Sequence, residues 1–220
     1  MAPVRDRRGN RVIILLMGPP GAGKGTQATL LEKATGLPHV STGDLFRAVN
    51  PKTPLGAKVS KIMAGGELVR DSLTNELLAQ RLQQKDCAKG FLLDGYPRTL
   101  AQAKYLDAWL KKRKKRIDAV LYFDLPVAKA VSRLSLRLTC DSCGMVYNEL
   151  RTPGVKKCVR CGGALYRRDD QSPAAVKKRF AEYGRKTEPV LAHYAAKLRR
   201  VDVGQTPEKT FHRAVIALGL

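Results

Sequence analysis

The chain has 220 residues, of which 44% are hydrophobic and 27% are charged, so it is expected to be globular rather than disordered, collagen-like or a coiled coil. Its formal net charge of +22 favours anionic partners such as nucleotides or nucleic acid. The longest apolar run, Val12–Met17, has six residues, which is too short to cross a membrane, so we expect no membrane partner. Two C-x-x-C pairs indicate a metal in a reducing compartment rather than disulfides, so we expect a cytoplasmic protein.

Strands and helices are expected to alternate along the chain after a basic tail, Met1–Arg11, which we interpret as a frayed terminus rather than a targeting signal. The expected strands are Val12–Met17, Pro38–Val40, Phe91–Asp94, Ala119–Leu125 and Val201–Val203. The expected helices are Lys24–Thr35, Asp44–Val49, Leu55–Ala64, Ser72–Lys85, Leu100–Lys112, Val127–Leu138, Pro173–Leu198 and Pro207–Leu218. This alternation predicts an α/β fold with a central parallel sheet flanked by helices. Residues 41–69 and 136–170 interrupt the pattern and are expected to be insertions over the carboxyl edge of the sheet.

The segment Gly18–Thr26 carries the strongest motif of the chain. It reads G-P-P-G-A-G-K-G-T and contains the phosphate-loop pattern G-x-x-x-x-G-K between a buried strand and a helix. In such a loop the backbone N–H groups and the helix dipole surround an anion, and Lys24 can reach the β- and γ-phosphates. Gly25 stands where Ser or Thr is usual, so the hydroxyl that often binds magnesium directly after the lysine is missing. We expect a P-loop NTPase core.

Two further motifs contain charged residues next to turns. Ser41–Asp44 reads S-T-G-D, and Arg47 follows at a spacing that places it on the same helix face as Asp44. Asp94–Arg98 reads D-G-Y-P-R and ends a buried strand. Asp94 is therefore placed to hold Mg²⁺ through water, and the planar guanidinium of Arg98 could bind a phosphate.

The four paired cysteines predict a metal site. Cys140 and Cys143 are separated from Cys158 and Cys161 by 14 residues, close to the spacing of four-cysteine zinc sites. Four thiolates complete a tetrahedral shell and leave no open position, so we expect a structural Zn²⁺, with iron as the alternative metal. Cys87 stands alone and is expected to pack in the core.

In this order and spacing, the motifs G-x-P-G-x-G-K-G-T, S-T-G-D-x-x-R and D-G-Y-P-R-T resemble those of the adenylate kinases, a family of nucleoside monophosphate kinases. The resemblance covers nearly the whole chain after Arg11. It implies a core formed by residues 1–40, 70–135 and 171–220, an AMP-binding insertion at 41–69 and a zinc-bearing lid at 136–170. It also implies a monomer that transfers a phosphoryl group from ATP-Mg to AMP and gives two ADP.

The resemblance also assigns residues one by one. For ATP binding it implies Gly21, Ala22, Gly23, Lys24, Gly25, Thr26, Arg133, Val146, Tyr147 and the backbone near Thr206. For AMP binding it implies Thr42, Arg47, Glu67, Leu68, Val69, Gly95, Tyr96, Pro97, Arg98, Gln102, Arg167 and Arg179. For catalysis it implies Lys24, Asp94, Arg98, Arg133, Arg137, Arg167 and Arg179. Arg133 and Arg137 are four residues apart and are expected on one helix face, whereas the three histidines fit no motif.

The choice of substrate base depends on Thr42 and Gln102, which match relatives that use AMP rather than UMP or CMP. A buried amide can both donate to and accept from a purine edge, so it rejects a base that leaves it unpaired. The alternative within this class is a kinase for another nucleoside monophosphate. The alternative from another class is a basic zinc-ribbon protein that binds nucleic acid, but we expect the basic run Lys111–Arg116 to be a solvated helix end.

Overall fold

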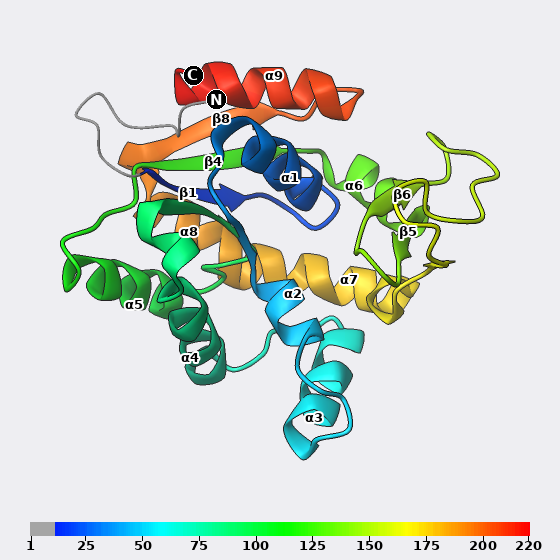
Figure 1. The fold of residues 1–220 in the computed structure, drawn as a ribbon, viewed down its shortest axis with the longest axis horizontal. Helices are drawn as coiled ribbons and strands as arrows, with labels where there is room; N and C mark the ends of the chain where they lie inside the picture. The colour runs from blue at the N-terminus through cyan, green and yellow to red at the C-terminus, as the bar shows by residue number, and fades with distance from the viewer. Residues whose placement is uncertain (1–11) are drawn as a thin grey trace.

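The computed structural model describes residues 12–220, and the expected basic tail Met1–Arg11 lies outside them. Its centre is a five-stranded parallel sheet in the order β2-β3-β1-β4-β8 (Figure 1). The strands are β1 (Val12–Met17), β2 (His39–Ser41), β3 (Gly90–Asp94), β4 (Ala119–Asp124) and β8 (Leu198–Asp202). The connections from β1 and β3 leave in opposite directions, so a crevice opens at their carboxyl ends, where open parallel sheets bind ligands.

Both faces of the sheet are covered by helices. In β1, Ile13 and Leu15 enter the core on one face, whereas Ile14 and Leu16 enter the core on the other. Figure 1 shows α1 and α9 on one side of the sheet and α4, α5 and α8 on the other. Among residues 12–220, no helix is both long and apolar enough to cross a bilayer. The helices of the core are α1 (Lys24–Thr35), α4 (Asp71–Leu82), α5 (Leu100–Lys111), α6 (Val127–Ser135), α7 (Pro173–Glu182), α8 (Glu188–His193) and α9 (Pro207–Leu218).

Two smaller bodies interrupt the core, and each has an apolar cluster of its own. Helices α2 (Thr42–Arg47) and α3 (Pro54–Ala64) pack around Phe46 and Val59. A separate antiparallel sheet has the order β6-β5-β7 and packs around Cys140 and Tyr147. Its strands are β5 (Arg137–Cys140), β6 (Val146–Asn148) and β7 (Leu165–Tyr166).

The helix expected over Val127–Leu138 is shorter than the sequence indicates. It ends at Ser135, and Arg137 begins β5, where it pairs with Asn148. The expectation that Arg133 and Arg137 share one helix face is therefore wrong. The backbone groups of Arg137 find partners in the β5–β6 ladder, and this tertiary pairing overrides the helical propensity of the local sequence.

The single long helix expected over Pro173–Leu198 is interrupted. Helix α7 ends at Glu182, a π-helical segment covers Tyr183–Thr187, and α8 begins at Glu188. Pro189 has no N–H to donate to a carbonyl one turn earlier, so the regular hydrogen-bond ladder cannot continue through it. A 3₁₀ turn then leads into β8, which begins at Leu198 rather than at Val201 as expected.

Candidate active site

The phosphate loop connects β1 to α1 at the carboxyl edge of the sheet. Lys24 is the first residue of α1, and its ammonium donates to the carbonyl oxygens of Gly18 (2.8 Å) and Pro19 (3.0 Å). Burial lowers the pKa of Lys24 from 10.5 to about 8, although the nearby carboxylate of Asp94 acts in the opposite direction. At neutral pH the side chain still carries the positive charge that an anionic ligand requires.

Two glycines allow the loop to approach neighbouring backbone. Gly18 has φ +144° and Gly21 has φ +85°, backbone conformations that residues with a side chain rarely adopt. A Cβ atom would lie 2.6 Å from the carbonyl oxygen of Phe123 at Gly18, and 2.6 Å from that of Ala130 at Gly21. The loop is thus held against β4 and α6 in a conformation that other residues would disrupt.

Asp94 lies at the end of β3, beside the phosphate loop. Its carboxylate is 3.5 Å from Nε2 of His39, which β2 places next to it. Burial acts to raise the pKa of Asp94, but His39 and the charge of Lys24 outweigh it, and the pKa is lowered. Asp94 is therefore an ionised, largely enclosed carboxylate at the position expected for magnesium. His39 is a contact that the sequence analysis missed.

The segment after β3 is tied down by a network around Arg98. The side chain of Arg98 donates to the carbonyl oxygen of Gly95 (2.8 Å), and the hydroxyl of Thr42 donates to the same oxygen (2.9 Å). Gln102 accepts from the backbone N–H of Arg98 (2.7 Å) and donates to Asp71 (2.7 Å). The amide of Gln102, expected to face a base, is thus used to position Arg98. Asp71 is the first residue of α4, one residue before the expected start of that helix at Ser72.

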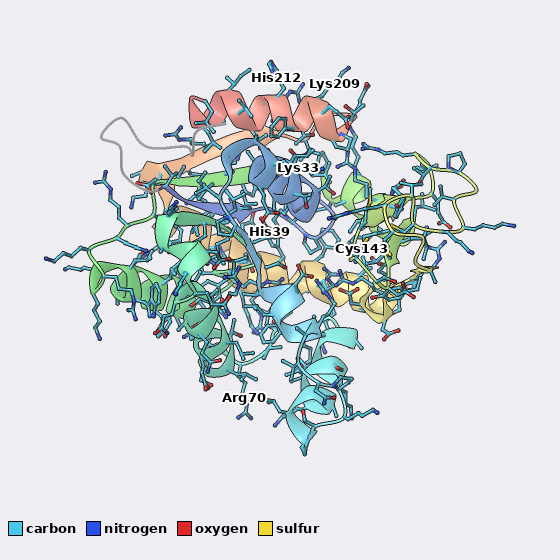
Figure 2. The ribbon with its side chains drawn as sticks, viewed as in Figure 1. Lys33, His39, Arg70, Cys143, Lys209 and His212 are labelled. Atoms are coloured by element: carbon cyan, nitrogen blue, oxygen red, sulfur yellow. The ribbon has the colours of Figure 1, made fainter. Side chains whose placement is uncertain are left out.

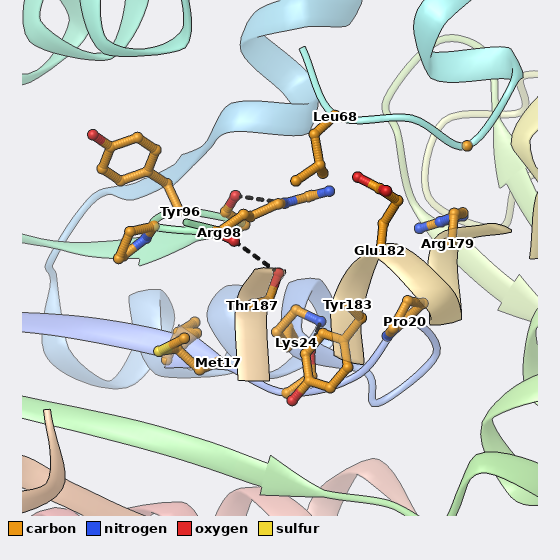
Figure 3. A pocket seen from close by; sticks show the side chains of 15 residues that line it. Met17, Pro20, Lys24, Leu68, Tyr96, Arg98, Arg179, Glu182, Tyr183 and Thr187 are labelled. Carbon is orange, nitrogen blue, oxygen red and sulfur yellow. Dashed lines mark hydrogen bonds between the residues drawn. The ribbon is translucent and has the colours of Figure 1, made fainter. Parts of the chain in front are cut away.

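The phosphate loop and Arg98 face one hollow (Figure 3). Lys24 enters it from the loop, Arg98 from the segment after β3, and Arg179 from α7. Leu68, Gly95, Tyr96 and Pro97, all expected at the AMP site, line the same hollow. Residues expected to bind ATP and residues expected to bind AMP therefore line the same cavity.

A second cluster of arginines surrounds the buried carboxylate of Asp170. Its partners are Arg168 and Arg179, each at 2.7 Å, and Arg137 at 3.4 Å. Burial lowers the pKa of Arg137 to about 9 and that of Arg179 to about 10, so both guanidiniums remain charged at neutral pH. Burial also acts to raise the pKa of Asp170, but the three arginines outweigh it and the pKa is lowered. Arg168 was not among the residues predicted from the sequence.

Arg167 and Arg133 lie apart from that cluster. Arg167 is 52% exposed and bonds to Glu149 and to the carbonyl oxygen of Ser135. Arg133 donates to the carbonyl oxygen of Gly204 over 3.1 Å, close to the start of α9. The hydroxyl of Thr206 caps that helix by accepting from the N–H of Lys209. Arg133 thus lies beside the loop where the backbone was expected to meet the base of ATP.

The nucleotide-binding residues expected in the two smaller bodies differ in their surroundings: some form ion pairs, some are buried and one is exposed. Arg47 and Asp44 share a face of α2, as the motif predicts, and they form an ion pair there. Glu67 pairs with Lys178 of α7 over 2.6 Å. Thr42 and Val69 are buried. In β6, Val146 is 44% exposed, whereas the side chain of Tyr147 is buried among the cysteines.

The four paired cysteines form one cluster, with all sulfur atoms within 4.8 Å of one another. Cys140 and Cys161 are 3.5 Å apart, as are Cys143 and Cys158, and all four are free thiols. A tetrahedral ion with metal–sulfur distances of about 2.3 Å places its sulfurs about 3.8 Å apart. The cluster therefore has the dimensions of a four-cysteine zinc site. Cys87 is buried in the main core, as expected.

The family model described as adenylate kinase matches residues 16–199 of the chain. The chain belongs to the adenylate kinase family.

Curated members of the adenylate kinase family resemble this chain over most of its length. A protein from Thermotoga neapolitana is 46% identical over 195 residues, which cover 86% of this chain and 89% of the relative. One from Archaeoglobus fulgidus is 46% identical over 198 residues, with 89% and 91% covered. One from Anaeromyxobacter sp. is 48% identical over 202 residues, with 90% and 94% covered. Each relative is named adenylate kinase.

Two residues at the site of this adenylate kinase family member, His39 and Arg168, were not predicted from the sequence. His39 reaches Asp94 because β2 pairs with β3, a contact that no local pattern indicates. Arg168 lies beside Arg167, and two adjacent arginines give no local signal for which one turns inward. Figure 2 shows where His39 and Cys143 lie relative to the central sheet.

Proposed function

We propose that the chain is an ATP:AMP phosphotransferase, which converts ATP and AMP reversibly into two molecules of ADP. The observation that carries this proposal is the hollow shared by Lys24 and Arg98. Lys24 belongs to a phosphate loop and Arg98 to a separate segment after β3, so one cavity offers a cation to each of two nucleotides. Membership of the adenylate kinase family supports the same activity.

In this reaction an oxygen of the AMP phosphate attacks the γ-phosphorus of ATP. The bond between that phosphorus and the oxygen bridging to the β-phosphate breaks, and its electron pair stays on the departing ADP. The transfer needs positioning, positive charge around the equatorial oxygens and exclusion of water, without a covalent nucleophile. We assign this work to Lys24, Arg98, Arg133, Arg137, Arg167 and Arg179, as the sequence predicts.

Magnesium enters with ATP and neutralises part of the phosphate charge. Asp94 would hold this ion through water, and its lowered pKa keeps the carboxylate ionised at neutral pH. The cysteine cluster would hold a structural Zn²⁺, because its four thiols have the spacing of a closed tetrahedral shell. Such a shell leaves no position at which substrate or water could be activated.

We propose that residues 41–69 and 136–170 move over the nucleotides, while residues 1–40, 70–135 and 171–220 form the core. The separate apolar clusters of these segments, around Phe46 and around Cys140, support this division. Figure 1 shows α3 and the β5–β6 region projecting from different sides of the body. Segments with small cores of their own can shift as units without disrupting the main core.

The remaining site residues are proposed as the sequence resemblance implies them. We propose that the other residues named in the sequence analysis for ATP and for AMP bind those nucleotides, and that Thr42 and Gln102 favour adenine as the acceptor base. Gln102 would act partly through Arg98, whose backbone it holds. We also propose that the protein works as a monomer in the cytoplasm. The four thiol ligands support the proposed compartment, because they need a reducing environment.

Product analysis tests the proposal. Incubation of the purified protein with ATP, Mg²⁺ and AMP should consume the two nucleotides in equal amounts and form two ADP for each pair. Formation of ADP without consumption of AMP would indicate an ATPase instead. Salt-sensitive RNA binding with no phosphoryl transfer would favour the nucleic-acid-binding alternative that the charge of +22 suggested.

A further inference from the structure

A group of exposed basic side chains lies at the amino edge of the central sheet, where its strands begin, opposite the candidate active site. Because the five strands are parallel, the segments that lead into them meet at this one edge. A 3₁₀ segment, Lys85–Lys89, leads into β3, and residues 112–118 connect α5 to β4. Figure 1 shows this connection on the side of the molecule away from the β5–β6 region. The exposed cations of these segments, which we call the basic face, are Lys85, Lys89, Lys111, Lys112, Arg113, Lys114 and Arg116.

The two segments of the basic face lie against each other. The ammonium of Lys115 donates to the carbonyl oxygen of Ala88 over 3.4 Å, and Ala88 belongs to the 3₁₀ segment before β3. The lysines before β3 and the basic residues after α5 therefore form one surface, although more than twenty residues separate them in the sequence.

Few acidic side chains offset this charge. Residues 85–89 and 111–118 contain only two carboxylates, those of Asp86 and Asp118. Asp86 is paired with Arg81 over 2.7 Å, and the carboxylate of Asp118 lies 3.7 Å from the guanidinium of Arg116. The basic face thus keeps a large excess of positive charge. Such an excess attracts polyanions and speeds their association.

Lys114 occupies a backbone conformation that favours glycine. Its φ is +54°, and it is the one non-glycine residue with a positive φ among residues 12–220. The N–H of Lys115 donates back to the carbonyl oxygen of Leu110 over 3.0 Å, which closes α5 in the way that usually places glycine at the left-handed position. A side chain costs free energy there, so the chain carries a cation where glycine would fit better. A strained residue of this kind points to a role for its side chain outside the fold.

Arg113 offers a surface on which a base can stack. Its Cζ lies 3.7 Å from the centroid of the Trp109 ring, and its guanidinium donates to the carbonyl oxygen of Trp109 over 3.2 Å. The side chain of Arg113 is nevertheless exposed, and guanidinium planes stack on unpaired bases. Stacking on planar side chains, combined with cations along the phosphates, is the usual way in which proteins bind single strands.

The basic face lacks the exposed apolar side chains that accompany basic residues in membrane-surface sites. In the described part of the chain, no large hydrophobic residue between 56 and 99 or between 101 and 126 is exposed. Trp109 itself is partly buried and packs against the main core. A nucleic acid therefore fits this surface better than a lipid bilayer does.

We propose that the basic face binds single-stranded nucleic acid, with its cations along the phosphates and a base on Arg113. This binding is a second property of the molecule and does not depend on the proposed phosphoryl transfer. The two processes use opposite edges of the sheet, so both can occur at once. The proposal also gives a ligand to part of the net charge of +22, which the nucleotides of the active site do not require.

Fluorescence anisotropy of the full-length protein tests the proposal. The probes are labelled oligouridylate and oligothymidylate of about 20 nucleotides, longer than the roughly 4 to 16 nucleotides of known single-strand sites, and they distinguish RNA from DNA. One variant removes three charges from the basic face, and a matched control removes three from exposed lysines of the α3 region. These variants are Lys111→Gln/Lys112→Gln/Lys114→Gln and Lys52→Gln/Lys58→Gln/Lys61→Gln. Competition with ADP at constant ionic strength reports on the active site, and vesicles of phosphatidylcholine and phosphatidylserine represent lipid.

We expect the unmodified protein to bind at least one of the two probes with an affinity that falls steeply as salt rises. The basic-face variant should bind at least about tenfold more weakly near about 100 mM salt, and the slope of log affinity against log salt should shrink by about 2, as for three lost phosphate contacts. The control variant should lose much less affinity. Saturating ADP should not displace the probe, and the turnover of ATP with AMP should be unchanged in the basic-face variant.

Lys114→Gly separates binding from folding. Glycine adopts a positive φ without strain, so this variant should melt no earlier than the unmodified protein while it binds the probe more weakly. Earlier melting with unchanged binding would show that the lysine serves the fold.

Several results would overturn the inference: no binding of either probe, equal weakening in the two triple variants, displacement by ADP, or tighter binding to the vesicles than to the probes. Absence of ADP formation by the unmodified protein would instead contradict the proposed function and leave this inference standing.

Discussion

The hydroxyl of Tyr147 donates a hydrogen bond to Sγ of Cys158 over 3.2 Å and accepts one from the backbone N–H of Val159 over 2.9 Å. The side chain is 5% exposed, so its polar end is enclosed within the cysteine cluster. The sequence placed Tyr147 near the adenine of ATP, but its hydroxyl is directed to a sulfur that would bind the metal. A partner of this kind fixes the orientation of a ligand and raises metal affinity.

Removal of that hydroxyl should weaken metal retention. Tyr147→Phe keeps the ring and loses the hydrogen bond to Cys158, so we expect zinc to pass to a chelating dye at least about tenfold faster, since partners behind the ligands contribute 10- to 100-fold in affinity. Tyr166→Phe is the control, because Tyr166 lies in the same small sheet and is 42% exposed. Equal retention in the two variants would show that the hydroxyl does not support the metal.

The metal itself should stabilise the lid rather than take part in the reaction. We expect one Zn²⁺ per chain, measured by metal analysis of protein purified under reducing conditions. Chelation should lower the melting temperature, because the cluster around Cys140 has little apolar core of its own. Turnover well below melting should largely survive once Mg²⁺ is restored. Loss of turnover while the lid remains folded would contradict a structural role, and absence of metal would contradict the site.

Lys24 and Arg98 should each be essential for turnover. We expect Lys24→Met and Arg98→Ala to lower kcat by at least about 100-fold, as for removal of other groups that stabilise transition-state charge. Circular dichroism should show that both variants remain folded, because neither side chain belongs to an apolar core. Near-normal turnover in either purified variant would remove that residue from the site.

The binding of ATP-Mg should weaken as the pH rises above 8. Burial lowers the pKa of Lys24 to about 8 in the free protein, and bound phosphates favour its charged form. The lysine must then regain a proton on binding, so affinity falls through this range, by about fourfold between pH 7.0 and 8.5 if the pKa of Lys24 is about 8. Calorimetry at saturating Mg²⁺ measures the effect. Lys24→Arg keeps its charge and should give a flat profile; the same slope in that variant would assign the titration to another group.

Much of the fold can be predicted from the sequence because its signals are local. The apolar run Val12–Met17, followed by glycines and Lys24, specifies a buried strand, a phosphate loop and a helix within a short stretch of chain. The cysteine spacing likewise brings four sulfurs together without long-range information.

The sequence-based predictions fail where residues distant in the sequence determine the local structure. Arg137 lies outside α6 because its backbone pairs with Asn148 in the β5–β6 ladder. His39 contacts Asp94 only because β2 pairs with β3. Arg167 and Arg168 are chemically identical neighbours, and the position of Asp170 determines which one faces inward. The interruption after α7 is an exception, because Pro189 at the start of α8 is a local signal for it.

We propose that one cavity binds ATP and AMP together and transfers a phosphoryl group between them. A coupled assay of the unmodified protein with ATP-Mg and each of AMP, UMP, CMP and GMP measures this transfer. We expect AMP to be by far the preferred acceptor and ADP to be the only nucleotide product with it. A preference for UMP or CMP would contradict the assignment of Thr42 and Gln102, and no transfer to any monophosphate would contradict the proposed function.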